Sequence, residues 1–289
     1  MKIIVFGAKG QLGSALRKKA ENNHSKTWYF LDKDQADVRN SQVLHAISKN
    51  INPEIIVNCA ALTEVDQLEN QEKEAFAVNA YGAENVANAS KSVNAKLIHV
   101  STDYVFDGKG VMEDGKRRPY RETDLPNPLM VYGKSKYLGE NLIRQSYSKH
   151  VILRTSWLYG GARCFVTKIL QQAAKRSEIH VVNDQIGTPT SAEALANAIT
   201  GIMETDCIGL YHSSCQGETT WYEFACLIMR YAKGKVRVVP VASEYFPQAA
   251  PRPKYSVLDN GRLNKLEIYR FGHWKEVAEK QLKHELNGY

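Results

Sequence analysis

The sequence predicts an α/β protein with a Rossmann-type, doubly wound parallel sheet and a smaller mixed α/β lobe built mainly from the C-terminal half. Three observations lead to this fold class. Short apolar runs alternate with helical stretches along the first half of the chain, as expected for parallel strands covered by helices. The first run, residues 2–6, ends in a glycine-rich turn that precedes a helical stretch. The second half has a mixed pattern of helices and short strands.

The composition is that of a globular protein that buries a core. Hydrophobic residues make up 43% of the 289-residue chain and charged residues 24%. The formal net charge is +7, but the basic residues are scattered and their densest cluster, Lys116–Arg118, is short. A nucleic-acid partner is therefore not expected. The positive excess fits a solvated surface and is compatible with attraction of a small anionic substrate.

The cysteines and the apolar runs predict a cytoplasmic location. The five cysteines are odd in number, widely spaced and without a C-x-x-C pair, which argues against a disulfide framework or a zinc site and suits a reducing compartment. The apolar run near the start, residues 3–6, is too short for a signal peptide. No apolar run approaches the length of a membrane span, so no membrane partner is expected.

The first predicted strand, residues 2–6, leads into glycines suited to a dinucleotide. Gly7 permits a tight turn, Gly10 lets the backbone approach a phosphate, and Gly13 lets the next helix pack closely on the sheet. That helix is expected over residues 11–22, and the amides at its start would face a pyrophosphate.

The next two strands bring an acidic residue and small residues to the same sheet edge. The second strand, residues 28–31, ends at Asp32, which is suited to accept hydrogen bonds from an adenosine ribose, with turn capping as the equal alternative. The third strand, residues 55–58, runs into Ala60 and Ala61. Their small side chains either leave room for a cofactor or pack against a helix.

A fourth strand completes this edge. A long helix is expected over residues 64–90, in which Asn79 needs a polar partner and should anchor a neighbouring strand or loop. The strand at 95–100 ends at Thr102, which would meet the glycine-rich turn at the carboxyl ends of the strands. Residues 104–130 are rich in glycine and proline, and a loop of this length is usually functional or mobile.

Tyr132 and Lys136 form a candidate proton-transfer pair. They are four residues apart, so they share one face of a helix. A neighbouring cation favours the phenolate, and a tyrosine whose pKa is lowered in this way can exchange a proton with a carbonyl or hydroxyl oxygen. This spacing alone is common on exposed helices. Here, however, the pair follows a dinucleotide-binding turn and the Thr102 strand, which favours the functional interpretation.

The second half is expected to form a lobe interleaved with the sheet. The domain boundaries predicted are 1–160 for the dinucleotide-binding part and 161–289 for the lobe. The remaining predicted helices cover residues 41–50, 165–176, 192–204, 220–232, 261–267 and 274–286, and the remaining strands cover 151–154, 179–182, 209–213 and 236–239.

These segments resemble the dTDP-4-dehydrorhamnose reductase family of the extended short-chain dehydrogenase/reductase superfamily. The superfamily pattern is Gly7-x-x-Gly10-x-x-Gly13, STDYVF at 101–106 and Tyr132-Gly-x-x-Lys136. Five segments carry the family pattern in the expected order over most of the chain: GQLG (10–13), VNCAALTEVD (57–66), STDYVFDG (101–108), RTSWLYG (154–160) and NDQIGTPT (183–190).

The resemblance implies that the protein reduces the C4 ketone of a dTDP-6-deoxyhexulose to dTDP-L-rhamnose, or makes a related deoxysugar nucleotide, for surface polysaccharides. Tyr132 would protonate the forming alkoxide, Lys136 would hold the nicotinamide ribose, and Thr102 would bind the substrate oxygen. Asp103 and Trp157 would contact the sugar or its diphosphate. The Trp157 ring has a core position as its alternative. For Arg252, in a Pro-Arg-Pro context, a diphosphate clamp and a solvated loop arginine are equal alternatives.

The resemblance also implies NADH or NADPH as cofactor. The acidic Asp32 favours NADH, whereas family members often accept both. The cofactor-lining residues expected are Gly7, Gly10, Gln11, Leu12, Gly13, Asp32, Asp37, Val38, Ala60, Ala61, Leu62, Tyr132 and Lys136.

The partners expected are a nucleotide-sugar substrate and, compatible with the family, a second copy in a homodimer. Some relatives bind magnesium at such a contact through glutamates; Glu193 matches one of those positions, but Ala15 stands at another, so no metal is expected. Two other functions stay open: a non-catalytic, nucleotide-binding regulatory subunit of the same family, and a sugar-nucleotide epimerase or dehydratase. The intact Tyr132–Lys136 pair argues against the first.

Overall fold

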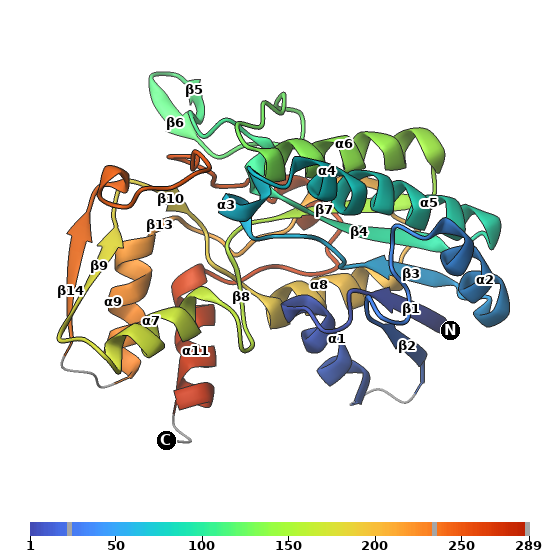
Figure 1. Cartoon of the computed structure of the whole chain (residues 1–289), viewed down its shortest axis with the longest axis horizontal. Helices are drawn as coiled ribbons and strands as arrows, with labels where there is room; N and C mark the ends of the chain where they lie inside the picture. The colour runs from blue at the N-terminus through green and yellow to red at the C-terminus, as the bar shows by residue number, and fades with distance from the viewer. Residues whose placement is uncertain (22–24, 233–235, 287–289) are drawn as a thin grey trace.

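The computed structural model describes residues 1–21, 25–232 and 236–286, and its central element is a six-stranded parallel sheet (Figure 1). Its strands are β1 (Lys2–Phe6), β2 (Thr27–Leu31), β3 (Ile55–Asn58), β4 (Lys96–Thr102), β7 (His150–Thr155) and β12 (Gly209–His212). Their spatial order is β12-β7-β4-β3-β1-β2, with every neighbouring pair parallel. The order reverses between β1 and β3, which makes their carboxyl ends the topological switch point. The predicted fold class is confirmed.

Alternate side chains of each strand enter two separate cores. In β1, Ile3 and Val5 belong to one hydrophobic cluster, whereas Ile4 and Phe6 belong to the other. This is the period of two that an extended chain requires. All four side chains are fully buried, so the strand needs a helical layer on each face.

Helices cover both faces of the sheet (Figure 1). On one face α1 (Gln11–Glu21) packs against α8 (Ala192–Met203), and on the other face lie α2 (Ser41–Ile51), α5 (Gly82–Ser92) and α6 (Val131–Ser146). The helix expected over 11–22 is α1, and its last expected residue, Asn22, lies outside the described residues. None of the described helices combines the length and the apolar content that crossing a membrane requires.

The single helix expected over 64–90 is wrong. The segment contains α3 (Val65–Leu68), a turn, α4 (Glu72–Phe76), one π-helical turn η1 (Ala77–Tyr81) and then α5. In the turn, Glu69 accepts the backbone N–H of Val131 at 2.8 Å, which satisfies a free donor at the start of α6. This break depends on a partner 62 residues away, so helical periodicity does not reveal it.

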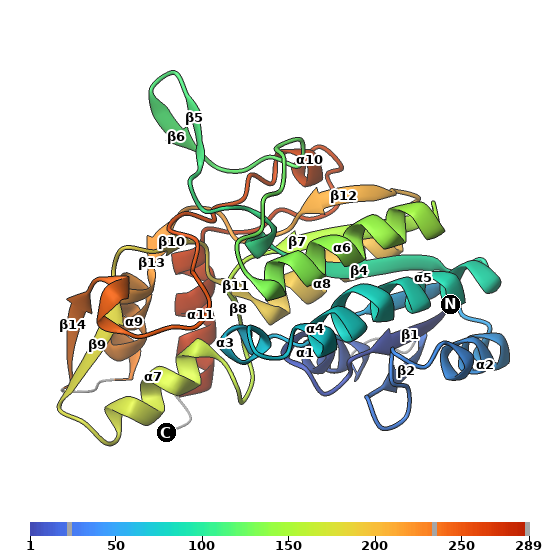
Figure 2. The same ribbon diagram turned by 45° about the horizontal axis from the view of Figure 1, so that its top comes forward.

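A smaller lobe lies beside the carboxyl ends of the sheet, at the left of Figure 1. Its helices are α7 (Phe165–Ala173), α9 (Trp221–Tyr231) and α11 (Trp274–Leu286), and its longest strands are the parallel pair β9 (Glu178–Val182) and β14 (Arg237–Val241). The short helix α10 (Gly261–Asn264) lies instead beside β12 of the main sheet (Figure 2). Two-residue pairs join it to the sheet: β8 (Leu158–Tyr159) with β11 (Thr190–Ser191), and β10 (Ile186–Gly187) with β13 (Thr219–Thr220). Elements this short leave no periodic signal in a sequence.

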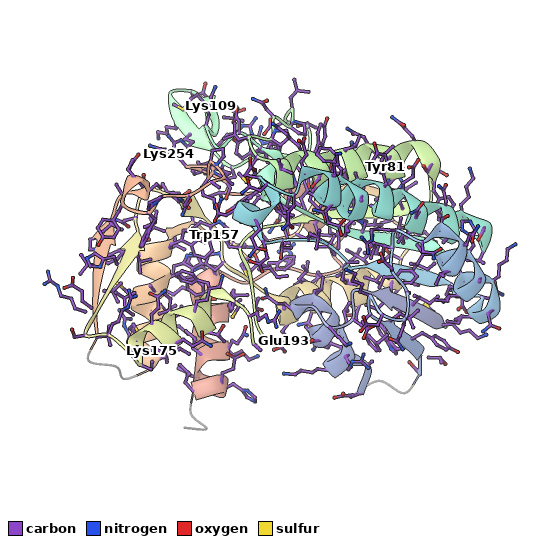
Figure 3. The ribbon with its side chains drawn as sticks, in the orientation of Figure 1. Tyr81, Lys109, Trp157, Lys175, Glu193 and Lys254 are labelled. Atoms are coloured by element: carbon purple, nitrogen blue, oxygen red, sulfur yellow. The ribbon has the colours of Figure 1, made fainter. Side chains whose placement is uncertain are left out.

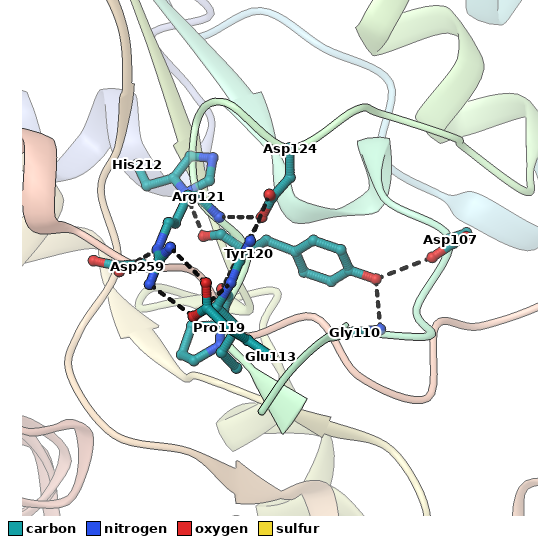
Figure 4. A network of polar contacts seen from close by, with 10 residues as sticks. Asp107, Gly110, Glu113, Pro119, Tyr120, Arg121, Asp124, His212 and Asp259 are labelled. Atoms are coloured by element: carbon teal, nitrogen blue, oxygen red, sulfur yellow. Dashed lines mark hydrogen bonds and ion pairs between the residues drawn. The ribbon is translucent and has the colours of Figure 1, made fainter. Parts of the chain in front are cut away.

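The loop at 104–130 contains a hairpin, β5 (Val111–Glu113) with β6 (Lys116–Arg118), that projects from the body (Figure 2). Asp114 and Gly115 both have positive φ, 51° and 72°, as a tight two-residue hairpin turn requires. Tyr120 fixes the base of the hairpin: its hydroxyl donates to Asp107 at 3.0 Å and accepts the N–H of Gly110 at 2.7 Å (Figure 4). Two short 3₁₀ turns, η2 (Asp103–Val105) and η3 (Ser243–Tyr245), flank the site described next.

Candidate active site

A cleft of about 920 Å³ opens between the carboxyl ends of the strands and the smaller lobe. This is the switch-point position at which open α/β sheets bind ligands. The predicted residues that line the cleft are Gly10, Gln11, Leu12, Gly13, Ala61, Thr102, Asp103, Tyr132, Lys136, Trp157 and Arg252. The predicted residues outside this lining are Gly7, Asp32, Asp37, Val38, Ala60 and Leu62.

The turn after β1 forms a cradle that only glycine allows. Gly7 has φ 80°, and a Cβ there would lie 2.6 Å from the backbone nitrogen of Ala60. A Cβ on Gly13 would lie 2.5 Å from the carbonyl oxygen of Gly7, so α1 approaches the turn as closely as backbone permits. Gly10 faces the cleft, and a Cβ there would meet only the Gly7 oxygen, at 3.3 Å. The residues present therefore fit the pyrophosphate of a dinucleotide, held at the start of α1.

Asp32 at the end of β2 has two kinds of partner. Its Oδ1 accepts the backbone N–H of Asp34 at 2.9 Å, which is the turn-capping role. Its Oδ2 lies 2.5 Å from Nζ of Lys9, from the glycine-rich turn. The hydrogen bond from Lys9 lowers the pKa of Asp32, and burial partly opposes this. The carboxylate of Asp32 and the exposed ammonium group of Lys9 thus lie together where the adenosine ribose of a dinucleotide would bind.

Three of the residues predicted to bind the cofactor instead contact other parts of the protein: Asp37, Val38 and Leu62. Asp37 binds Arg39, which lowers its pKa. Val38 is buried against α5, where a Cβ on Gly82 would lie 2.7 Å from its side chain. The backbone of Leu62 makes two hydrogen bonds with the Asn79 side chain, at 2.9 and 3.1 Å. Asn79 therefore anchors a loop, as expected.

The end of β4 presents a buried group of hydroxyls around a carboxylate. Thr102 Oγ1 donates to Asp103 Oδ1 at 3.1 Å, and Ser156 Oγ donates to Oδ2 at 2.9 Å. Burial raises the pKa of Asp103 to about 6, and these hydroxyls act in the opposite direction. Thr102 Oγ1 also accepts the N–H of Tyr104 at 3.2 Å. With its proton directed to Asp103, Thr102 has a remaining lone pair for another donor.

Tyr132 stands in the first turn of α6, beside Thr102. Its ring contacts that of Tyr104 edge-on, with centroids 5.9 Å apart. Burial raises the pKa of Tyr132 to about 12, while hydrogen bonding with Thr102 lowers it. The expected lowering of this pKa is therefore wrong for the structure described, because loss of solvation outweighs the favourable contacts. A phenol in this state is a proton donor at neutral pH.

Lys136 lies one turn later and is 2% exposed. Its Nζ donates to the carbonyl oxygen of Val100 at 2.7 Å and lies 3.2 Å from Nε2 of His99. Burial lowers the pKa of Lys136 to about 8, although Glu140 and Cys59 act to raise it. The sequence gave no reason to single out His99, because its role depends on a contact across 37 residues.

Trp157 borders the cleft in a constrained position, between the sheet and the lobe (Figure 3). Its φ is 44°, in the left-handed region that a non-glycine residue rarely adopts. One face of its indole stacks on Trp221, with centroids 3.6 Å apart and planes 5° from parallel. A Cβ on Gly187 would lie 2.3 Å from the indole, so Trp157 is held on this side too. Trp221 is a cleft residue that the sequence did not single out.

The lobe side of the cleft carries several cations. Arg252 binds Asp66 of α3 at 2.7 Å, and the N–H of Ala250 donates to the same carboxylate at 3.1 Å, so this segment is joined to the sheet domain. Further lining residues that sequence reasoning missed are Arg163, Lys168, Arg176, His180, Tyr245 and Phe246. Lys168 lies in α7, whereas Arg176 follows the end of that helix, so no helical spacing in the sequence links the two cations.

Comparison with known proteins agrees with this geometry. Residues 1–287 match the family described as RmlD substrate binding domain. The spore coat polysaccharide biosynthesis protein SpsK of Bacillus subtilis is 38% identical, over 98% of this chain and 97% of that protein. The dTDP-4-dehydrorhamnose reductase of Escherichia coli K12 is 35% identical, over 99% and 98% respectively. The crystal structure of dTDP-4-dehydrorhamnose reductase from Bacillus anthracis in complex with NADP superposes with a TM-score of 0.90 at 39% identity, covering 98% of this chain and 99% of that one.

The cleft at the switch point, the glycine cradle, Tyr132 and the buried Lys136 thus occur in a chain that matches these reductases over nearly its whole length. The chain belongs to the RmlD family of NAD(P)-dependent sugar-nucleotide reductases of the dTDP-4-dehydrorhamnose reductase type.

Proposed function

We propose that the protein reduces the C4 ketone of dTDP-4-dehydrorhamnose, or of a closely related 6-deoxyhexulose nucleotide, in the synthesis of a surface polysaccharide. The observation that carries the proposal is the placement of Thr102, Tyr132 and Lys136 in one cleft with the glycine cradle. The similarity to SpsK supports a polysaccharide product and leaves the sugar open between rhamnose and a related deoxysugar. Residues 1–160 would bind the dinucleotide and residues 161–289 most of the substrate.

The dinucleotide NAD(P)H would supply the hydride that reduces the ketone. Gly10, Gln11 and Leu12 would hold its pyrophosphate at the start of α1, with Gly7 and Gly13 shaping the cradle. The other positions proposed to border it are Asp32, Asp37, Val38, Ala60, Ala61 and Leu62. The pairing of Asp32 with Lys9 suits either reduced cofactor. The Asp32 carboxylate favours the ribose diol of NADH, and the Lys9 cation favours the 2′-phosphate of NADPH.

Tyr132 would donate the proton that the new hydroxyl group needs. Its raised pKa keeps the phenol protonated at neutral pH, and negative charge developing on the substrate oxygen favours the transfer. Thr102, fixed by Asp103 and by the Tyr104 amide, would orient the phenol and the substrate oxygen. Lys136 would bind the nicotinamide ribose and, when protonated, stabilise the phenolate left behind.

The lobe side of the cleft suits a nucleoside diphosphate. Lys168, Arg176 and Arg252 would attract its two phosphates, Arg252 by exchanging its bond to Asp66. Tyr245 is 55% exposed and stacks on His180 with centroids 4.9 Å apart, so it offers an open aromatic face to a base. Trp157 and Asp103 would border the sugar between these two ends.

The test is a reduction assay with the purified chain. The 4-keto sugar nucleotide is supplied with NADH or NADPH, and the fall in reduced-cofactor absorbance is followed together with the product. Folded protein that oxidises neither cofactor with any stereoisomer of the ketone would reject the proposal. Purification with tightly held oxidised cofactor, and product of unchanged redox state, would instead indicate an epimerase or dehydratase.

A further inference from the structure

A buried chain of polar groups joins the end of β3 to Lys136. Asn58 Oδ1 accepts the backbone N–H of Ala60 at 3.1 Å, and Asn58 Nδ2 lies 3.1 Å from Nδ1 of His99. Nε2 of the same ring lies 3.2 Å from Lys136 Nζ. Asn58 and His99 are each 1% exposed. Groups buried to this degree must satisfy one another, because water does not reach them.

The backbone amide of Ala60 determines which group donates and which accepts at each hydrogen bond of this series. A backbone N–H can only donate, so it requires the amide oxygen of Asn58, and the NH₂ of Asn58 must then face His99. Nδ1 of His99 accepts from that NH₂, which leaves the proton of the neutral ring on Nε2. The Nε2–H is thereby aimed at Nζ of Lys136.

Lys136 can accept this hydrogen only as a neutral amine. An ammonium group has three donors and no lone pair, so a protonated Lys136 would set two donors against each other at 3.2 Å. Relief would require the ring proton to move to Nδ1 and the Asn58 amide to turn over, which breaks the contact with Ala60. A neutral amine meets every demand: its lone pair accepts from His99, and one of its hydrogens goes to the Val100 carbonyl at 2.7 Å.

The surrounding charges agree with this arrangement. Burial lowers the pKa of His99 well below its usual value, so the ring stays neutral without any contribution from a charged Lys136. Burial also lowers the pKa of Lys136, against Glu140 on the same helix and Cys59 after β3.

We propose that His99 is a positioning residue for Lys136: its Nε2–H binds the lone pair of the amine, so it aims the side chain at the cleft and lowers its affinity for a proton, and the proton that displaces this contact comes from the cleft side. The other end of this series of hydrogen bonds is the backbone N–H of Ala60, which can only donate, so no proton reaches Lys136 from that end. The role in turnover rests on the proposed function, whereas the hydrogen-bond direction and the Lys136 titration can be measured without any substrate.

The first experiment observes the ring itself. Histidine labelled with ¹⁵N is followed by long-range proton–nitrogen correlation spectra from about pH 6 to about pH 9, around the usual histidine titration range. The His99→Gln spectrum identifies the signal of His99. A ring that stays neutral throughout is expected, with its proton on Nε2 at the upper end of the range, where Lys136 is deprotonated. A ring protonated on Nδ1 at that end, or one that becomes charged in this range, would overturn the proposal.

The second experiment measures the consequence for Lys136. The affinity for NADPH, from cofactor fluorescence, is followed against pH in the wild type, in His99→Gln and in Lys136→Ala. A glutamine amide can turn its oxygen toward an ammonium group, so the proton affinity of Lys136 should rise about tenfold or more in His99→Gln. Lys136→Ala should lack this titration step. An unchanged step in folded His99→Gln would overturn the proposal.

Two further variants complete the test. His212→Gln is the matched control, because this ring is also fully buried but bonds to the Tyr120 carbonyl at 3.0 Å; the Lys136 step should stay in place. If His99→Gln does not fold, Asn58→Asp reverses the chain, since a carboxylate accepts from both Ala60 and His99. The His99 proton should then appear on Nδ1 and the Lys136 step should move to higher pH; absence of both changes would refute the idea. Failure of ketone reduction alone would reject the proposed function and leave these readouts intact.

Discussion

Replacing Gly133 by alanine should reduce turnover far more than stability. Gly133 lies between Tyr132 and Lys136, on the side of α6 that touches η2. A Cβ there would lie 2.1 Å from the carbonyl oxygen of Tyr104 and 3.0 Å from Cβ of Pro128. Carbon–oxygen contacts normally begin near about 3.3 Å, so the helix and η2 must separate by roughly 1 Å.

The size of the effect follows from that separation. A displacement of about 1 Å in a catalytic constellation costs roughly 10²-fold in rate, and the moving parts here carry Tyr132 and the Thr102 strand end. Overpacking costs about 1–3 kcal/mol, and the better helix propensity of alanine returns about 1 kcal/mol. The free energy of unfolding should therefore fall by no more than about 2 kcal/mol.

The assay compares kcat for ketone reduction with the melting temperature of the same preparations. Lys134→Ala is the control, since its side chain is exposed on the same helix and should leave both quantities unchanged. Wild-type kcat in folded Gly133→Ala would show that the close approach of α6 to Tyr104 does not set the geometry of the site.

Four other changes probe separate parts of the site. Tyr132→Phe should lower kcat by roughly 10²–10⁴-fold, as loss of a general acid does, with NADPH affinity by fluorescence nearly unchanged; wild-type turnover would reject the assignment. Lys9→Ala should weaken NADPH binding roughly tenfold and NADH binding little, because Lys9 can leave Asp32 for a 2′-phosphate; equal losses for the two cofactors would contradict this. Glu140→Gln should lower the free energy of unfolding in urea by about 3–5 kcal/mol, because the fully buried carboxylate binds Arg154 at 2.7 Å, whereas exposed Glu276→Gln should not. Asp103 has a folded pKa of about 6 against an ordinary 3.8, so the folded state binds the extra proton and wild-type stability falls as pH rises between these values. The stability of Asp103→Asn relative to wild type should therefore increase as pH rises across that window and stay constant above it; a difference that does not change with pH would refute the burial argument.

The glycines and strands could be predicted because their causes are local. Gly13 is required by a backbone approach to Gly7 in the same turn, Gly7 has a positive φ there, and the apolar runs report burial on both faces of the sheet. The sequence predicts that Asn79 needs a polar partner but does not identify it, because the loop that Asn79 anchors lies 17 residues away in sequence. The same reasoning fails at Glu69, whose contact with Val131 interrupts a stretch with otherwise helical character.

In the candidate site, too, features with local causes could be predicted and features that depend on distant contacts could not. Tyr132 and Lys136 could be found from spacing and context, but the direction of the tyrosine pKa depends on burial, which the sequence does not show. Likewise, Asp32 could be placed at the end of β2, whereas its pairing with Lys9 depends on how the glycine-rich turn folds back. Trp221 and His99 act only through contacts made by the finished fold, with Trp157 and Lys136 respectively.

Helical spacing brings Tyr132 and Lys136 to one face, yet different neighbours determine the chemistry of each. Tyr132 faces the hydroxyl and carboxylate at the end of β4, and these adjust a phenol that burial keeps protonated. Lys136 is held from the sheet side by Val100 and His99, which favour its neutral form. Burial lowers the pKa of Lys136 to about 8, because a buried ammonium group is costly, so its proton is held less firmly than that of an exposed lysine. Negative charge that develops in the cleft favours the protonated form, so the cation is strengthened where the reaction needs it.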